Sequence, residues 1–573
     1  MKNKLVMIGW DAATWDLLTP WVQAGELPNL ARLMKLGSYG TLGSTPLPLS
    51  PAAWSTIVTG QNPGRHGVFD WFERKEGSYK VEYVHTGRIA AKTLWEYYSE
   101  GGKQIGVFNL PMVYPAARVQ GFMVSGMAAP NVHAPNFAYP PDLITDLENH
   151  AGPFRLVEEE VYKYGREDAY LQAILDSIDI QWHAMRYLVE RYPCDAYLLV
   201  FMQSDHIQHK FWRYLDPAFP GYNPAHDSRY RDAILQVYRA LDRILGELFD
   251  FFGNTTTYIL LSDHGAGPSH GIMFINRWLR SEGLLSLRRH PITWGKLFMA
   301  KSNLILRFYR LAAHLGLGSL AQLVSKPARN KVISSFLSLD DVDWQRTQAY
   351  SRGAFGQIFI NLKGREPLGI VEPGEAYEQI VNEIVDKLLQ LKHPESGEPL
   401  ITAVHRREQV YSGPYLERAA DVMFTIQDYL YQSSVKLGLE SADILGKSEY
   451  EDSGTHRSEG ILVMAGPGIN CGGIIQKASV TDILPTVLAL SNLPVPQNLD
   501  GQPLRNVFSQ DLLKQLQYLD REEGEGACKQ APASSKEGTH GLASTADKVT
   551  APDLADDELA QIEERLRNLG YLG

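Results

Sequence analysis

The sequence predicts an α/β domain built around a mainly parallel sheet. Five short apolar runs, each bounded by turn-forming residues, have the character of buried strands; they are residues 4–9, 105–109, 195–202, 256–262 and 460–465. Helical patterns alternate with several of these runs, which is typical of a sheet covered by helices on both faces. Ligands of such sheets usually bind beyond the carboxyl ends of the strands. The residues next to the runs are therefore the first candidates for a functional site.

The interruptions of this alternation predict how the domain is elaborated. Residues 1–520 are predicted to form one catalytic domain, with insertions near 128–190 and 280–450 that roof the active site. The composition of residues 521–553 turns to Gly, Ala, Ser, Lys and Glu without an apolar period, which predicts a disordered linker. Helical spacing returns in residues 554–573 and predicts a C-terminal helical tail.

Composition and charge exclude several classes of function. The net charge of −11 disfavours nucleic-acid binding, which needs a basic surface. The three cysteines form neither a CxxC pair nor a disulfide framework, so a reducing compartment is favoured. The first residues read as a strand rather than a signal peptide, and no apolar run reaches the ~18 residues that span a bilayer. We expect a soluble, cytoplasmic enzyme.

Acidic and histidine side chains stand beside the predicted strands. They are Asp11, Asp205, His209, Asp263, His264 and His456. Carboxylate oxygens and imidazole nitrogens together can hold paired divalent cations. Each residue alone has a plainer interpretation, since Asp11 could cap the next helix and His456 could be an ordinary loop histidine. Their shared placement at strand ends favours a two-metal site.

The spacing within two of these pairs supports metal binding. Asp205 and His209 stand four residues apart, so on a helix they share one face, although His206 is a competing candidate. Asp263 and His264 are adjacent at a predicted strand end and are followed by glycine, so they can reach two ions about 4 Å apart.

Ser50 is the candidate nucleophile. Pro51 suits the first turn of a predicted helix over 51–59, which would make Ser50 its N-cap. The free N–H groups and positive dipole end of that helix would face an incoming phosphate. A metal ion could activate the hydroxyl. The alternative is that Ser50 only caps the helix.

The order of these residues resembles the alkaline phosphatase superfamily, and within it the type I phosphodiesterase/nucleotide pyrophosphatase branch. The supporting stretches are WSTIVTGQNPGRHGVFDW, LLSDHGAG, SGTHRSEGILVMAGPGI and SVTDILPTVLALSNLPVPQNLDGQPL. The resemblance covers roughly residues 3–507. It implies an alkaline phosphatase-like three-layer sandwich with inserted cap segments.

The resemblance also implies roles for the seven residues. One ion would be bound by Asp205, His209 and His456, and the other by Asp11, Asp263 and His264. Ser50 would lie between the ions, contact them, and form a covalent phospho-serine that water later hydrolyses. The expected ions are two Zn²⁺, with Mn²⁺ as the alternative.

Two departures bear on the substrate. Nucleotide pyrophosphatases usually carry Asn three residues after the nucleophile, where this chain has Ala53, so their substrate preference is not carried over. Ser50 is followed by PAAW rather than the sulfatase pattern. We expect a hydrolase of small phosphate mono- or diesters; the alternatives are a phosphomutase using the same residues and a non-catalytic metal-binding regulatory protein. The sequence predicts neither the leaving group nor the oligomeric state.

A basic segment is the last feature. Residues 287–331 contain nine Lys and Arg residues and no acidic residue. A helix over 295–315 would be amphipathic, with apolar and basic stripes. This predicts peripheral contact with an anionic membrane through 288–331, or steering of anionic substrates; the alternative is a roof helix with a solvated edge.

Overall fold

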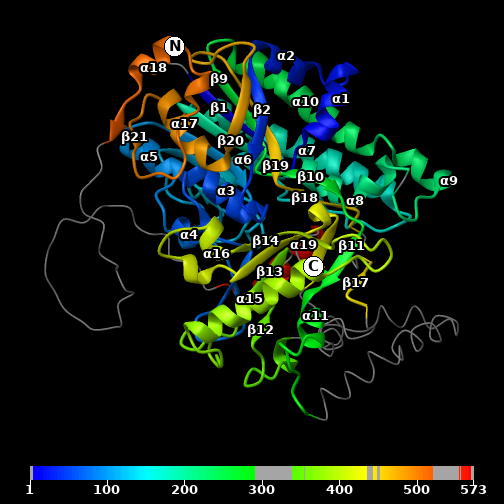
Figure 1. Ribbon diagram of the computed structural model, residues 1–573. Coiled ribbons are helices and arrows are strands. Elements are labelled where there is room, and N and C mark those ends of the chain that lie inside the picture. The colour runs from blue at the N-terminus through cyan, green and yellow to red at the C-terminus, as the bar shows by residue number, and fades with distance from the viewer. Residues whose placement is uncertain are drawn as a thin grey trace, which may run out of the picture.

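A nine-stranded sheet forms the centre of the computed structural model, which describes residues 4–217, 219–290, 339–353, 355–434, 443–447, 452–519, 554 and 556–569 (Figure 1). The strands, in their order across the sheet, are β20 (Ile474–Ser479), β2 (Gly37–Gly43), β19 (Glu459–Ala465), β9 (Thr257–Leu261), β1 (Leu5–Trp10), β8 (Ala196–Phe201), β5 (Ile105–Leu110), β6 (Gly121–Ser125) and β7 (Ala138–Tyr139). All five apolar runs are strands of this sheet, which confirms the predicted α/β class.

The strand directions make the sheet mainly parallel. The five strands from β9 to β6 run parallel to one another, whereas β19 is antiparallel to both β9 and β2, and β7 is antiparallel to β6. Every residue of β1, β5, β8 and β9 is buried, as expected for strands covered on both faces.

Helices cover both faces. On one face, α10 (Ala233–Phe252) packs on α2 (Pro28–Leu36), α7 (Glu167–Arg191) and α8 (Gln203–Leu215). On the other face, α3 (Ser50–Thr59) packs on α17 (Ile483–Leu490). Two consecutive residues of β1 mark the two faces, since Trp10 contacts Tyr238 of α10 whereas Gly9 faces Trp54 of α3. The molecule is therefore a three-layer sandwich at this level.

A smaller antiparallel sheet adjoins the sandwich. Its strands are β12 (Ala349–Tyr350), β13 (Gly356–Ile360), β15 (Val422–Ile426) and β14 (Ile401–Arg406), and α15 (Glu375–Gln390) packs on β14. These elements share an apolar cluster of their own. They lie within the second predicted insertion, whose boundaries stay a prediction.

The C-terminal helix α19 (Asp556–Leu569) joins the main core through Ile562, Leu566 and Leu569. The predicted linker at 521–553 lies outside the described residues. So do residues 291–331, and with them nearly all of the basic segment whose membrane contact stays a prediction. Within the described ranges, no helix combines the length and the apolar character that crossing a membrane requires.

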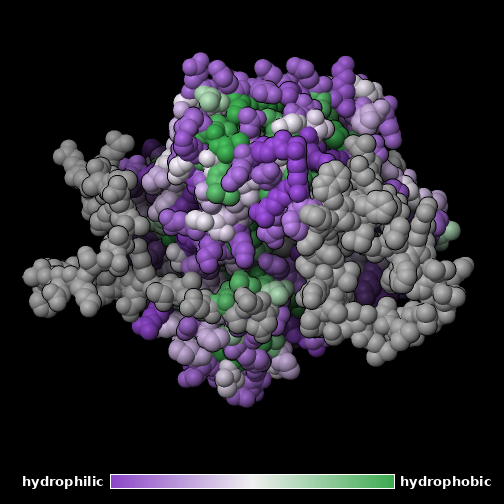
Figure 2. Space-filling view, turned by 90° about the horizontal axis from the view of Figure 1, so that it is seen from below, coloured by the Kyte–Doolittle hydropathy of each residue, from purple (hydrophilic) through white to green (hydrophobic). Residues whose placement is uncertain are grey.

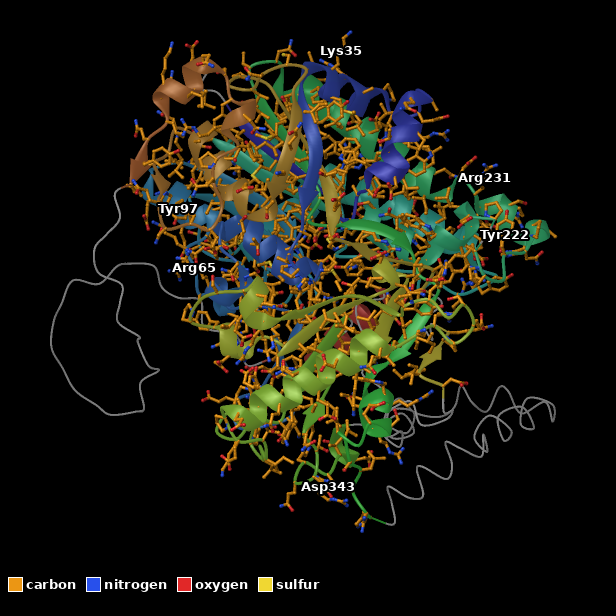
Figure 3. The ribbon with its side chains drawn as sticks, viewed as in Figure 1. Lys35, Arg65, Tyr97, Tyr222, Arg231 and Asp343 are labelled. Carbon is orange, nitrogen blue, oxygen red and sulfur yellow. The ribbon has the colours of Figure 1, made fainter. Side chains whose placement is uncertain are left out.

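Apolar side chains fill the core, whereas charged side chains are common on the surface. Seen from below, the surface is mostly hydrophilic with scattered apolar patches (Figure 2). Charged residues such as Lys35, Arg231 and Asp343 lie at the periphery (Figure 3). The predicted site residues lie in the interior instead, because all of them are buried.

Candidate metal centre

The carboxyl ends of three central strands bring the predicted ligands together. β1 lies between β8 and β9, with Trp10 opposite Phe201 and Gly9 opposite Leu261. The residues that follow these strands therefore meet at one edge of the sheet. They form two clusters, in each of which the candidate ligand atoms lie within 4.8 Å of one another.

The first cluster consists of Asp205, His209 and His456. Asp205 and His209 lie on α8, one turn apart, and His456 lies on β18 (Gly454–Arg457). The Oδ1 atom of Asp205 is 3.3 Å from Nε2 of His209 and 3.7 Å from Nε2 of His456. Asp205 and His209 thus share one face of α8, as their spacing predicts, and the fold brings His456 beside them from the far end of the chain.

The second cluster consists of Asp11, Asp263 and His264. Nε2 of His264 is 3.3 Å from Oδ2 of Asp263 and 3.6 Å from Oδ1 of Asp11. These two carboxylate oxygens are buried and have no hydrogen-bond partner, although each carboxylate uses its other oxygen as an acceptor. A buried oxygen without a donor is costly. A divalent cation at this point would satisfy both oxygens, so the residues fit the metal that the sequence predicts.

The three histidines are oriented for metal binding through the same ring atom. In each ring Nδ1 lies against a backbone carbonyl: His209 against Gly454 (3.1 Å), His264 against Gly265 (3.0 Å) and His456 against Pro48 (2.6 Å). A protonated Nδ1 donating to each carbonyl makes Nε2 the unprotonated nitrogen of the neutral ring, which is the atom that can coordinate a metal. All three Nε2 atoms point into the clusters.

Electrostatics also favour cations here. Burial raises the pKa of Asp11, and the negative charges of Asp263 and Asp205 raise it further. Burial opposes ionisation of Asp205 too, but His209 and His456 hold its pKa below the usual range. The rings of His264 and His456 stack with centroids 3.9 Å apart, so the two clusters adjoin. Such adjacency suits two ions about 4 Å apart.

Ser50 lies beside the second cluster. It is the first residue of α3, one position earlier than predicted, and Leu49 is the N-cap. The prediction of Ser50 as the N-cap is therefore wrong, and no side-chain capping bond is present. Its Oγ instead lies 3.2 Å from Nε2 of His264. The hydroxyl is thus free of a capping role and directed at the metal ligands.

His206, the competing candidate, belongs to neither cluster. Its Nδ1 lies 3.0 Å from Oε2 of Glu158, a buried carboxylate that also accepts a bond from Tyr170. Adjacent helix positions point in different directions, so His206 faces away from the ligand edge that Asp205 and His209 share.

Trp54 is a site residue that sequence reasoning missed. It lies one turn after Ser50 on α3, and its Nε1 donates to Oδ2 of Asp11 at 2.8 Å. This bond leaves Oδ1 of Asp11 directed at the second cluster. The ring fits because residue 9 is glycine, where a Cβ would lie 2.5 Å from a Trp54 ring carbon. A glycine before the ligand in MIGWD was the available signal.

The substitution Trp54→Phe is expected to weaken Zn²⁺ binding about tenfold, within the range for residues that orient a metal ligand. The ring remains, but Asp11 loses the donor that orients it. Titration of metal-free protein with Zn²⁺ measures the change. Trp182→Phe is the matched control, because Nε1 of the buried Trp182 on α7 donates a 2.8 Å bond to Glu247 of α10, and neither residue belongs to a cluster. Equal affinities in both variants would contradict the role of Trp54.

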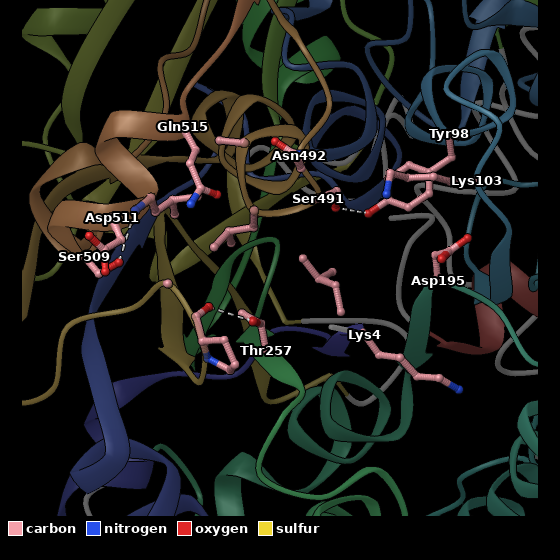
Figure 4. A pocket seen from close by; sticks show the side chains of 16 residues that line it. Lys4, Tyr98, Lys103, Asp195, Thr257, Ser491, Asn492, Ser509, Asp511 and Gln515 are labelled. Atoms are coloured by element: carbon pink, nitrogen blue, oxygen red, sulfur yellow. Dashed lines mark hydrogen bonds between the residues drawn. The ribbon is translucent and has the colours of Figure 1, made fainter. Parts of the chain in front are cut away.

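A separate cavity of about 540 Å³ lies at the opposite edge of the sheet, where β1 and β9 begin (Figure 4). Its polar lining includes Lys4, Lys103, Asp195 and Ser491. Neither cluster that could hold a metal among the described residues reaches it. The candidate metal ligands therefore lie at the other end of these strands, away from this cavity.

Solved structures and a family model match this chain. Phosphonoacetate hydrolase from Sinorhizobium meliloti 1021, solved in complex with phosphonoacetate, is 13% identical with a TM-score of 0.48, over 84% of this chain and 94% of that chain. Human ectonucleotide pyrophosphatase/phosphodiesterase 5 is 14% identical with a TM-score of 0.45, over 88% of this chain and 100% of that chain. A search of curated proteins finds no match. The model of the type I phosphodiesterase/nucleotide pyrophosphatase family matches residues 5–459, a span that contains both clusters and Ser50. The chain therefore belongs to the type I phosphodiesterase/nucleotide pyrophosphatase family of hydrolases, within the alkaline phosphatase superfamily.

Proposed function

We propose that the protein hydrolyses small phosphate esters at a pair of divalent ions, through a covalent intermediate on Ser50. The observation that carries this proposal is the position of the Ser50 Oγ, 3.2 Å from Nε2 of His264, where the two clusters adjoin. The first cluster would hold one ion and the second cluster the other. Three N/O ligands each, with a further position open to substrate, suit catalytic Zn²⁺, and Mn²⁺ is the alternative.

The residues around Ser50 have distinct tasks in this reaction. The bound ions would favour the alkoxide form of the hydroxyl and neutralise charge on the phosphoryl oxygens. Ser50 Oγ loses its proton and attacks phosphorus as the bond to the leaving group breaks, and the leaving group takes up a proton. Water then cleaves the phospho-serine and restores the serine hydroxyl, releasing phosphate from a monoester or a phosphate monoester from a diester. The first turn of α3 presents N–H groups to the phosphoryl oxygens. Phe355 packs against the candidate ligand His456, with ring centroids 5.3 Å apart, and the Pro48 carbonyl lies against Nδ1 of the same ring.

A substrate panel tests the proposal. Aryl phosphate, diaryl phosphate, nucleotide, phosphonate and sulfate are assayed with added Zn²⁺ or Mn²⁺, and again after chelation. We expect turnover of at least one phosphate ester, lost on chelation and restored by metal. Metal-loaded protein that turns over no phosphate ester would refute the proposal. Transfer of the phosphoryl group to a second bound alcohol, without free phosphate, would indicate the phosphomutase alternative.

We also propose that the protein works in a reducing compartment such as the cytoplasm. Cys194 is buried and Cys471 is exposed, and both are free thiols. An exposed free thiol is more typical of reducing conditions than of secreted proteins. Fractionation of cells that express the full chain tests this assignment.

A further inference from the structure

The first cluster depends on two elements that meet only in the folded protein. His209 lies on α8, whereas His456 lies on β18, and Nε2 of one ring is 3.1 Å from Nε2 of the other. β18 pairs with β10 (Gly265–Pro268), which places Ala266 opposite His456. This pairing sets the strand direction, but it does not hold β18 against α8.

A short segment before β18 makes that connection. The backbone N–H of Ser453 donates to the carbonyl of His209 at 2.7 Å, and its Oγ donates to the carbonyl of Lys210 at 2.9 Å. The carbonyl of Gly454 lies 3.1 Å from Nδ1 of His209. The residue before Ser453, Asp452, forms an ion pair with Lys210. The segment is therefore fastened to the helix turn that carries His209.

The ion pair is unusual in its burial. The side chains of Lys210 and Asp452 are each 2% exposed. Two charges in such surroundings carry a large desolvation cost, and a well-packed apolar pair is often at least as stable. Removing only one partner takes away compensation that the buried charge of the other partner relies on. Stability alone therefore gives little reason for an ion pair here, directly behind a metal ligand.

We propose that Lys210 and Asp452 are positioning residues that hold His456 against His209 and keep the charge behind the first cluster balanced. This inference rests on the proposed two-metal function. Asp452 anchors the segment that leads into His456. It also neutralises the Lys210 ammonium, which would otherwise repel a cation bound at the neighbouring His209.

The two partners should differ in effect. Asp452→Asn leaves a buried ammonium behind His209, so it both loosens the segment and repels the cation. Lys210→Met also loosens the segment, but the carboxylate that remains attracts a cation. We therefore expect the loss of metal affinity to be larger for Asp452→Asn. The double variant Lys210→Met/Asp452→Asn lacks the ammonium of Lys210 as well. Its affinity for the metal should therefore exceed that of Asp452→Asn alone.

Titration of metal-free protein with Zn²⁺ measures these differences directly, without an assay of turnover. The unchanged protein is expected to bind two ions. Asp452→Asn is expected to lower the affinity for the ion of the first cluster by about 10- to 100-fold, as for other residues that orient metal ligands. The affinity for the second ion should stay unchanged. In a His209→Ala background the ion of the first cluster is already lost, so Asp452→Asn should cause no further loss.

Asp421→Asn is the matched control. Asp421 is fully buried in the smaller sheet, where Oδ2 lies 2.6 Å from Nη2 of Arg365. Its substitution also breaks a buried ion pair, so the melting temperature should fall while both Zn²⁺ affinities stay unchanged. If Asp452→Asn does not fold, Lys210→Met takes its place, with a several-fold loss confined to one ion.

Two kinds of failure are distinguishable. The positioning role would be overturned if Asp452→Asn (or Lys210→Met in its place) bound both ions as the unchanged protein does, or lost affinity for both ions equally. Either result would leave the two-metal function intact. The same change in Asp421→Asn would overturn it as well, because the effect would then follow from any broken buried pair. Absence of Zn²⁺ binding in the unchanged protein would overturn the proposed function itself.

Discussion

Replacing Ser50 with alanine is expected to lower the turnover of a phosphate ester by at least about a thousandfold, since removal of an attacking nucleophile costs at least this much in well-studied hydrolases. The fold and both ions should remain. The Ser50 side chain makes no capping bond, so even the ~1 kcal/mol of a lost cap does not apply. Turnover and bound Zn²⁺ are measured on the same preparation.

Ser55→Ala provides the comparison on the same helix. The Ser55 hydroxyl is buried and has no hydrogen-bond partner, and Ser55 belongs to neither cluster. Its removal should leave turnover near that of the unchanged protein. Covalent trapping of phosphate on a residue other than Ser50 would refute the nucleophile assignment.

Replacing Asp263 with asparagine is expected to abolish turnover and to lower the metal content. The Oδ2 atom of Asp263 is one of the two buried oxygens without a donor, so it is the part of the second cluster most in need of a cation. An amide removes the charge and can direct N–H groups at the ion. Metal analysis and turnover measure the two effects.

The melting temperature of the metal-free Asp263→Asn variant shows whether metal is lost because a ligand is missing or because the protein unfolds. Burial raises the pKa of Asp263, which means that its ionised form is disfavoured in the folded state. Near neutral pH, well above the unfolded pKa, this carboxylate therefore destabilises the metal-free fold, and asparagine should not lower its melting temperature. Asp242→Asn is the control, since Asp242 accepts bonds from the N–H groups of Asn29 and Leu30 at the start of α2. That variant removes a buried carboxylate outside both clusters, so it should keep its metals and its turnover. Full activity and unchanged metal in Asp263→Asn would contradict the ligand assignment.

The parts of the site that follow strands could be predicted from the sequence. Buried parallel strands appear as continuous apolar runs, and the residues after such runs meet at one edge, which located Asp11, Asp205 and Asp263. The bond from Trp54 to Asp11 could not be found this way, because it depends on how α3 lies across β1. The Lys210–Asp452 pair joins distant parts of the chain and leaves no periodic signal. Strand direction is equally invisible to periodicity, so the antiparallel course of β19 was not anticipated.

The place of β19 in the sheet has a consequence for how the chain matures. β2 emerges early in synthesis, yet among the described residues it pairs with β19 and β20, which come from the far end of the domain. Until those residues leave the ribosome, β2 has no neighbour and β9 has a bare edge, the kind of surface that invites wrong pairing between nascent chains. When β19 inserts, it pairs with both β2 and β9. It also brings His456, which precedes β19 in the chain, to the first cluster. Assembly of the first candidate metal cluster is thus tied to completion of the sheet, so a chain halted before this strand can neither finish the fold nor complete that cluster.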